Sequence, residues 1–186
     1  MVSLSVSLAL EVIGLRKRFT AGIASCRATH DVLRGINLEL ERGEVAAIVG
    51  AAGCGRSTLL LCLAGLMAAD EGIIRHFGDD SRGAGIRSTR YHLDFDEVSM
   101  GSKSTAPATH LLDLRDVPTL QLEPFRHWLT ERSVRGDAAV VVCDIDVARQ
   151  LTPRVLGLRE GRLQETTRAQ ARVAERRFVD RPFERV

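Results

Sequence analysis

The sequence is poor in aromatic residues and carries almost no net charge. Only 4% of its 186 residues are aromatic, and the formal net charge is +2. A nucleic-acid-binding domain would show a basic surface, or aromatic side chains on which bases stack. We therefore expect no nucleic-acid partner.

Long apolar runs and paired cysteines are also missing. No segment reaches the roughly 18 consecutive apolar residues of a membrane span, and the alternating residues 2–8 lack the basic start of a signal peptide. The cysteines form no C-x-x-C pair, which favours reduced cytosolic thiols; they are Cys26, Cys54, Cys62 and Cys143. We expect a cytoplasmic protein that meets the inner face of a membrane only through a partner.

The length fits one domain, and the apolar pattern predicts alternating strands and helices. Residues 45–49 are continuously apolar, as a parallel strand covered on both faces should be. Further strands are expected at 11–15, 36–40, 72–77, 111–114, 138–143 and 155–158, the last turning back as a hairpin at 162–164. Helices are expected at 57–66 and 124–132. The chain is thus predicted to be α/β.

A glycine-rich loop joins the strand at 45–49 to the helix at 57–66. Its residues are Gly50, Ala51, Ala52, Gly53, Cys54, Gly55, Arg56, Ser57 and Thr58. This is the strand–loop–helix setting that a G-x-x-x-x-G-K-[ST] phosphate loop requires. Glycines let backbone N–H groups approach an anion, and the helix N-terminus adds its positive dipole. The loop predicts a site for a nucleoside triphosphate.

Three side chains of the loop have expected roles. Arg56 replaces the usual lysine; it keeps the charge, but its guanidinium is larger and planar, so we expect weakened binding. Ser57 supplies a hydroxyl that could coordinate Mg²⁺. Cys54 sits among N–H donors, and we expect its thiol pKa to be lowered.

The first half of the chain resembles the ATP-binding domain of ATP-binding cassette (ABC) transporters in the order and spacing of its motifs. The matching segments are 15–19, 32–40, 42–44, the loop itself, 59–66 and 70–72. The resemblance implies a P-loop NTPase-type three-layer domain, with a mainly parallel sheet and an antiparallel β subdomain. It also implies ATP and Mg²⁺ as ligands, with Phe19 stacked on adenine.

The second half resembles the same family but has lost its catalytic side chains. Residues 111–119 are similar to the Walker B strand, where Asp116 would support Mg²⁺, and Val117 replaces the glutamate that polarises water. Residues 140–149 are similar to the switch segment, with Cys143 in place of its histidine. Valine cannot act as a general base, so the rate enhancement of about 10²–10⁴-fold that such a base provides is lost. The thiol of Cys143 is only a weak hydrogen-bond donor. We predict no catalytic residue here.

The family's helical subdomain, with its L-S-G-G-Q signature, is missing. We predict a single domain over residues 1–165, an irregular segment at 79–108 in place of that subdomain, and a charged tail at 166–186. Residues 90–94 fit two interpretations, a remnant strand ending at Asp94 or a flexible surface segment.

Three functions remain open. The chain could bind Mg-ATP with weak or no hydrolysis, as a regulatory or structural subunit. It could be a working ATPase subunit in which Asp113 or Glu123 substitutes for Val117, although strand alternation is expected to point Asp113 away from the phosphates. It could also be a scaffold without nucleotide. The resemblance implies a protein partner, either a second copy or a full-length ABC-type subunit.

Overall fold

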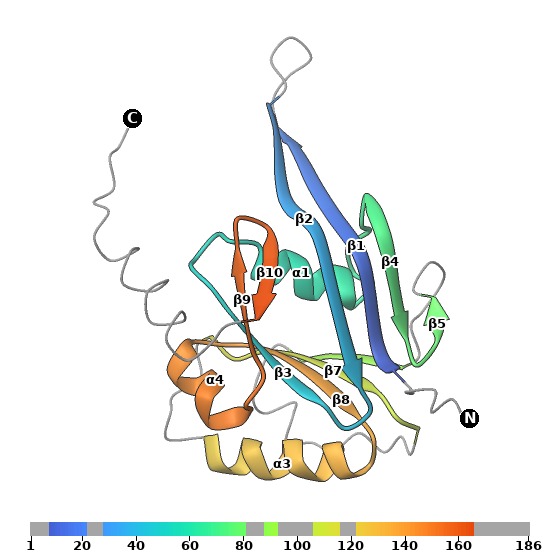
Figure 1. Ribbon diagram of the computed structural model, residues 1–186, viewed down its shortest axis with the longest axis vertical. Helices are drawn as coiled ribbons and strands as arrows, with labels where there is room; N and C mark the ends of the chain where they lie inside the picture. The colour runs from blue at the N-terminus through green and yellow to red at the C-terminus, as the bar shows by residue number, and fades with distance from the viewer. Residues whose placement is uncertain (1–7, 22–27, 81–87, 93–105, 116–121, 166–186) are drawn as a thin grey trace, which may run out of the picture.

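The computed structural model describes residues 8–21, 28–80, 88–92, 106–115 and 122–165, which form two sheets and three helices (Figure 1). The antiparallel sheet has the order β2 (Ala28–Glu41), β1 (Leu8–Ala21), β4 (Glu71–His76), β5 (Asp79–Asp80). The larger sheet has the order β10 (Arg162–Glu165), β9 (Val155–Arg159), β3 (Val45–Val49), β8 (Ala138–Val142), β7 (Thr109–Asp113), β6 (Thr89–His92). Neighbours in it are parallel except β9 and β10. The helices are α1 (Arg56–Leu63), α3 (Leu122–Val134) and α4 (Ile145–Leu151).

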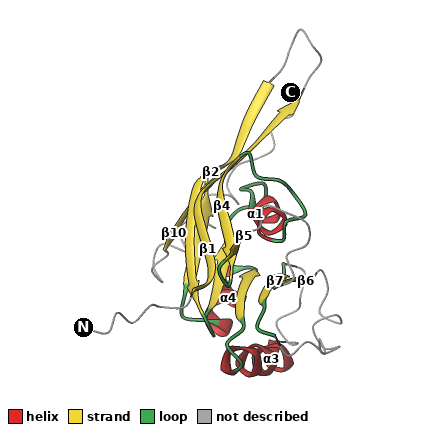
Figure 2. Ribbon diagram, turned by 90° about the vertical axis from the view of Figure 1, so that its right-hand side faces the viewer, coloured by secondary structure: helices red, strands yellow, loops and turns green. Residues whose placement is uncertain are grey.

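The central strands of the larger sheet are buried on both faces, and their alternate residues enter two different cores. Ala46 and Ile48 of β3 pack with α1 and the antiparallel sheet. Ala47 and Val49 pack with α3 and α4 on the other side. Figures 1 and 2 show the result, with α1 between the two sheets and α3 and α4 beyond the larger one. The predicted three-layer α/β fold, with a mainly parallel sheet and an antiparallel sheet, is confirmed.

Most elements lie where the sequence places them, with several differences, one of which is that α1 ends at Leu63 and not at residue 66. Strand β3 has the predicted bounds, and α1 is short and apolar all round, with Leu59, Leu60 and Leu63 fully buried. Helix α4 was not predicted, because seven residues are too few to show a helical period. Strands β1 and β2 are much longer than predicted, 14 residues each, and extend as a hairpin past the rest of the molecule (Figure 1).

Two described strands lie inside the segment 79–108: the short β5 at its start, and β6. Of the two interpretations of residues 90–94, the structure shows a strand: β6 runs from Thr89 to His92, parallel to β7. Asp94 lies outside the described residues. The larger sheet therefore continues one strand beyond β7.

His76 is fully buried on β4 and makes folding sensitive to acid. Its Nε2 lies 2.9 Å from the carbonyl oxygen of Leu63, and burial lowers its pKa from 6.5 to about 4. The folded pKa is below the unfolded one, so this stabilisation is complete above pH 6.5 and is lost as the pH falls toward 4. We expect His76 to account for about 2 kcal/mol of the loss in unfolding free energy between pH 7 and pH 5.

Urea unfolding at the two pH values checks this expectation. Between pH 7 and pH 5, a His76→Leu variant should lose less unfolding free energy than the parent. The control is His127→Leu, because the His127 side chain is 79% exposed; this variant should lose as much unfolding free energy as the parent. Equal losses of unfolding free energy in the parent and in His76→Leu would contradict the acid sensitivity attributed to His76.

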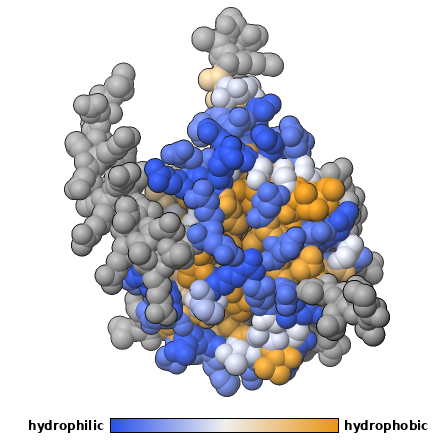
Figure 3. Space-filling model, in the orientation of Figure 1, coloured by the Kyte–Doolittle hydropathy of each residue, from blue (hydrophilic) through white to orange (hydrophobic). Residues whose placement is uncertain are grey.

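No described helix is both long and apolar enough to cross a lipid bilayer. On the face shown in Figure 3, hydrophilic residues cover much of the surface over the hairpin, with apolar atoms between them. Among the described residues, the large exposed apolar side chains are Ile13, Phe19, Leu66 and Val134.

Candidate phosphate-binding site

The glycine loop leaves the end of β3 and enters α1 without a side-chain cap. The N-cap of α1 is Gly55, which has no side chain to accept the N–H groups of the first turn. Gly55 has φ +105°, and a Cβ there would lie 2.9 Å from Cγ1 of Val32. A Cβ on Gly50 would lie 2.5 Å from the carbonyl oxygen of Leu158. Both positions therefore need glycine, which leaves a loop that exposes backbone N–H groups to an anion.

Arg56 occupies the first position of α1 and carries an unsatisfied donor. Its side chain is only 8% exposed, and its buried Nη1 has no hydrogen-bond partner in the described structure. Its positive charge acts to lower the thiol pKa of Cys54 in the loop and of Cys143 at the end of β8. Leaving a buried donor unpaired costs about 1–3 kcal/mol, and more for a charged group. An anion that enters the loop would supply the missing acceptor.

The two cysteines beside Arg56 are neutral thiols. Burial raises the pKa of Cys54, although Arg56 opposes the rise, so the expected lowering was wrong: removal from water outweighs the nearby charges. Burial also raises the pKa of Cys143 to about 12. Cys143 is fully buried where the resemblance places the switch histidine. It offers the site neither charge nor a strong donor.

Phe19 lies on β1, near the turn end of the hairpin. It pairs with His30 of β2, two residues from Val32, whose side chain borders Gly55. The ring is 40% exposed, and the ammonium of Lys17 lies 5.5 Å from its centroid. The positive charge of Lys17 also acts to lower the pKa of Cys62 in α1. The side of the hairpin that carries Lys17 therefore faces this helix. An exposed ring beside a phosphate loop is suitably placed to stack on a base.

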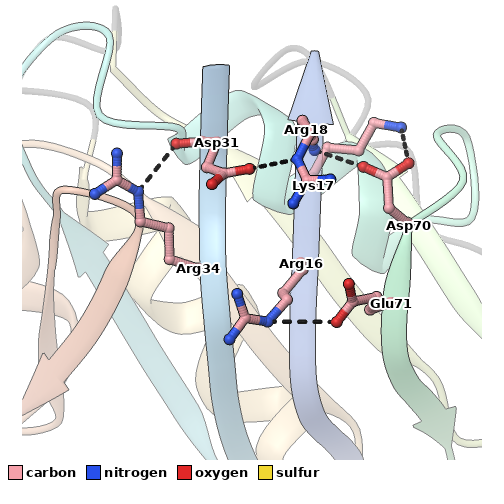
Figure 4. Close-up of polar contacts among 7 residues, drawn as sticks. All are labelled: Arg16, Lys17, Arg18, Asp31, Arg34, Asp70 and Glu71. Atoms are coloured by element: carbon pink, nitrogen blue, oxygen red, sulfur yellow. Dashed lines mark hydrogen bonds and ion pairs between the residues drawn. The ribbon is translucent and has the colours of Figure 1, made fainter. Parts of the chain in front are cut away.

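The cations around Phe19 are already paired with carboxylates (Figure 4). Arg18 contacts Asp31 across the hairpin at 2.7 Å, and Lys17 contacts Asp70 at 3.2 Å. These pairs join β1 to β2 and to the residue before β4. The Arg18–Asp31 pair lies near the turn end of the hairpin and is largely exposed.

Asp113 and Arg115 form an ion pair at the end of β7 that the sequence analysis did not anticipate. Arg115 Nε donates to Asp113 Oδ1 at 2.7 Å, and Arg115 Nη2 contacts Oδ2. Asp113 follows Leu111 by two residues and therefore shares its face, where Leu111 packs in the core that contains α1. The expectation that Asp113 points away from the phosphate side was wrong, since this face is the one that α1 covers.

The described residues provide few ligands for Mg²⁺. Ser57 lies at the second position of α1, and its role as a Mg²⁺ ligand stays a prediction. Asp116 and Val117 lie outside the described residues. The described part of the chain has no group of three or more His, Cys, Asp or Glu side chains that could hold a metal ion.

The parallel sheet, the glycine loop and the helix that follows it define a P-loop nucleotide-binding fold. Residues 33–106 match the family model of the ABC transporter. The aliphatic sulfonates import ATP-binding protein SsuB of Rhodopseudomonas palustris is 31% identical over 182 residues, 93% of this chain and 53% of that protein. The sulfate/thiosulfate import ATP-binding protein CysA of Bordetella bronchiseptica is 36% identical over 93 residues, 50% of this chain and 24% of that protein. The chain thus spans about half the length, or less, of these curated relatives.

Solved structures of ATP-binding cassettes share the fold. The ADP conformation of MJ1267, an ATP-binding cassette of an ABC transporter, has a TM-score of 0.67 at 12% identity, covering 94% of this chain and 99% of that one. The dimeric post-hydrolysis state of the cassette MJ0796, bound to ADP and Pi, has a TM-score of 0.66 at 17% identity, covering 85% and 98%. Together with the sequence matches, these similarities confirm the resemblance carried by the motifs: the chain is related to the ATP-binding domains of ABC transporters.

Proposed function

We propose that this chain binds ATP at the loop of residues 50–58 and hydrolyses it weakly or not at all. The observation that supports this most directly is the buried guanidinium of Arg56, whose Nη1 lacks an acceptor at an uncapped helix N-terminus. A triphosphate would provide acceptors for Arg56 and for the loop N–H groups together. Phe19 would stack on the adenine.

Weak hydrolysis follows from the side chains that surround the loop. The neutral thiol of Cys143 cannot act as a histidine does at the γ-phosphate. Asp113 has both carboxylate oxygens on Arg115, so it is not available as a base that accepts a proton from water. Glu123 lies on α3, with its carboxylate 81% exposed and paired with Arg126. Neither acid is a good substitute for the missing glutamate, which disfavours a working ATPase.

The proposed cellular role is that of a regulatory or structural subunit. SsuB and CysA are named as ATP-binding proteins of sulfonate and sulfate import. By analogy, we propose that this chain pairs with a second copy or a full-length ATP-binding subunit. Such a complex would hold it in the cytoplasm, at the membrane surface.

Replacing Arg56 tests the proposed function. We expect Arg56→Ala to weaken ATP binding by about 10- to 100-fold, the equivalent of one or two charge-assisted hydrogen bonds. Arg56→Lys should restore part of the affinity, because it returns the charge to the loop. Titration calorimetry with ATP measures both variants, and circular dichroism checks that they fold.

Arg126→Ala is the matched control, since Arg126 is an exposed arginine paired with a carboxylate far along the chain, on α3. It should bind ATP like the parent. A folded parent protein that takes up no ATP at millimolar concentration would refute the proposal and favour a scaffold.

A further inference from the structure

Strand β6 is the edge strand of the larger sheet among the described residues, and a pair of histidines ties it to β7. His92, the last residue of β6, is in register with Leu112, which packs in the core that contains α3. His92 therefore lies on the α3 side of the sheet, as does His110 of β7. His92 Nε2 lies 3.2 Å from His110 Nδ1, and the two rings stack with their centroids 5.4 Å apart.

A chain of hydrogen bonds fixes which nitrogen of each ring carries a proton. The carboxylate of Asp137, which is 5% exposed, accepts from His110 Nε2 at 3.3 Å. In neutral His110 the proton is therefore on Nε2, and Nδ1 is the acceptor. The N–H of His92 Nε2 donates to this Nδ1. The chain thus runs from the edge strand through His110 to a buried carboxylate.

Helix α3 encloses the two rings. Trp128 of α3 sets its ring nearly perpendicular to both, with its centroid 4.8 Å from that of His110 and 6.0 Å from that of His92. His110 is only 1% exposed. The titratable or charged groups that face His110 are His92 and Arg90 of β6, Arg132 of α3 and Asp137 before β8, while its register partner on β8 is the apolar Ala139.

Burial keeps His110 neutral while β6 is in place. It lowers the pKa of His110 from 6.5 to about 4, although Asp137 opposes the change. Opening of β6 would carry His92 away from Nδ1 and admit water, so the pKa of His110 would return toward 6.5. Because the pKa is lower in the closed state, that state is fully stabilised above pH 6.5 and loses this stabilisation as the pH falls toward 4.

Protonation also acts on the hydrogen bond between the two rings. One added proton leaves the bond intact, since either ring can hold it and still donate to the other or accept from it. Two added protons set N–H against N–H and two cations side by side, so that no hydrogen bond joins the rings. Acid therefore weakens the contact as well as favouring the open state.

We propose that the hydrogen-bonded pair of His92 and His110, backed by Asp137, is a latch that holds β6 on the sheet at neutral pH and releases it in mild acid. The release is local, because β6 pairs with β7 alone among the described strands. The sheet would lose its edge strand while β7, β8 and β3 stay paired. The proposal does not depend on nucleotide binding.

Hydrogen exchange of backbone amides, followed by NMR at pH 7 and pH 5, tests the latch. After correction for intrinsic exchange rates, the protection of the β6 amides should fall about 20-fold. This factor is the increase in opening that follows from a pKa of about 4 in the closed state and 6.5 in the open state. His110→Leu removes the titrating ring, and its β6 amides should lose less than about threefold.

Two further variants separate local opening from unfolding of the whole protein. His76→Leu reduces the acid sensitivity of global unfolding, but His76 lies on β4 of the other sheet, so β6 should keep its fall of about 20-fold. His127→Leu changes a 79% exposed side chain on α3, the helix that carries Trp128, and should match the parent.

Three results would overturn the latch. The first is a β6 fall that shrinks in His76→Leu together with that of β8, since β6 would then exchange only by global unfolding. The second is unchanged protection of β6 in the parent, and the third is a full fall retained in His110→Leu. Should His110→Leu fail to fold, imidazole nitrogen NMR of the parent decides: a His110 ring that titrates at pH 6.5 or above in the folded protein refutes the proposal.

Discussion

A Gly55→Ala variant is expected to lose about 2–4 kcal/mol of unfolding free energy and most of its affinity for ATP. The residue has φ +105°, a backbone region that costs a side chain about 1–3 kcal/mol. The added Cβ would also lie 2.9 Å from Cγ1 of Val32 and 3.3 Å from Cδ2 of Leu33, in a filled core. Relief of the clash would push the loop away from β2 and move Arg56 with it.

Gly53→Ala is the matched control, because it has a similar conformation but open space. Its φ is +78°, and nothing lies within 4 Å of an added Cβ. We expect a loss of about 1 kcal/mol, from the backbone alone. Urea unfolding and ATP calorimetry measure both variants; equal effects would show that the contact between Gly55 and Val32 does not position the loop.

Asp137→Ala is expected to destabilise the protein by about 3–5 kcal/mol. Asp137 is 5% exposed, accepts the N–H of Ala108 at 2.9 Å and lies 3.3 Å from His110 Nε2. Its cationic neighbour is Arg132 of α3, at 3.8 Å, because burial lowers the pKa of His110 to about 4 and leaves that ring neutral. Removing the carboxylate leaves a buried cation and a buried N–H without their acceptor.

Urea unfolding checks this value against two further variants. Asp137→Asn keeps an acceptor oxygen and should lose less than Asp137→Ala. Asp146→Ala removes an 86% exposed carboxylate that pairs with Arg149, and we expect a change below about 0.5 kcal/mol. A loss for Asp137→Ala as small as that for Asp146→Ala would contradict the role assigned to the buried group.

The phosphate loop could be predicted from sequence because its determinants are local. A continuous apolar strand, three glycines and an apolar helix follow one another within residues 45–63, and the structure places all three as expected. The same holds for the hairpin of β9 and β10. Phe19 lies on β1 and Ser57 on α1, and the roles given to all these residues stay predictions.

The rest of the site depends on contacts between distant segments. Whether Asp113 faces α1 depends on the register of β7 against β8, which the sequence does not state. The pairing of Arg115 with it follows from that orientation. The pKa of Cys54 was mispredicted for a related reason, since the local N–H groups were visible in the sequence but the burial of the thiol was not.

Strand β3, which leads into the phosphate loop, has both of its sheet neighbours in the last third of the described chain. It pairs with β8 and β9, at residues 138–142 and 155–159. Contacts over such separations form slowly, and during synthesis they wait until the later segment has been made. A growing chain therefore carries its glycine loop for about a hundred residues before the sheet can close around it. We expect the phosphate loop to be among the last parts of this protein to form, and ATP bound there would stabilise the completed fold.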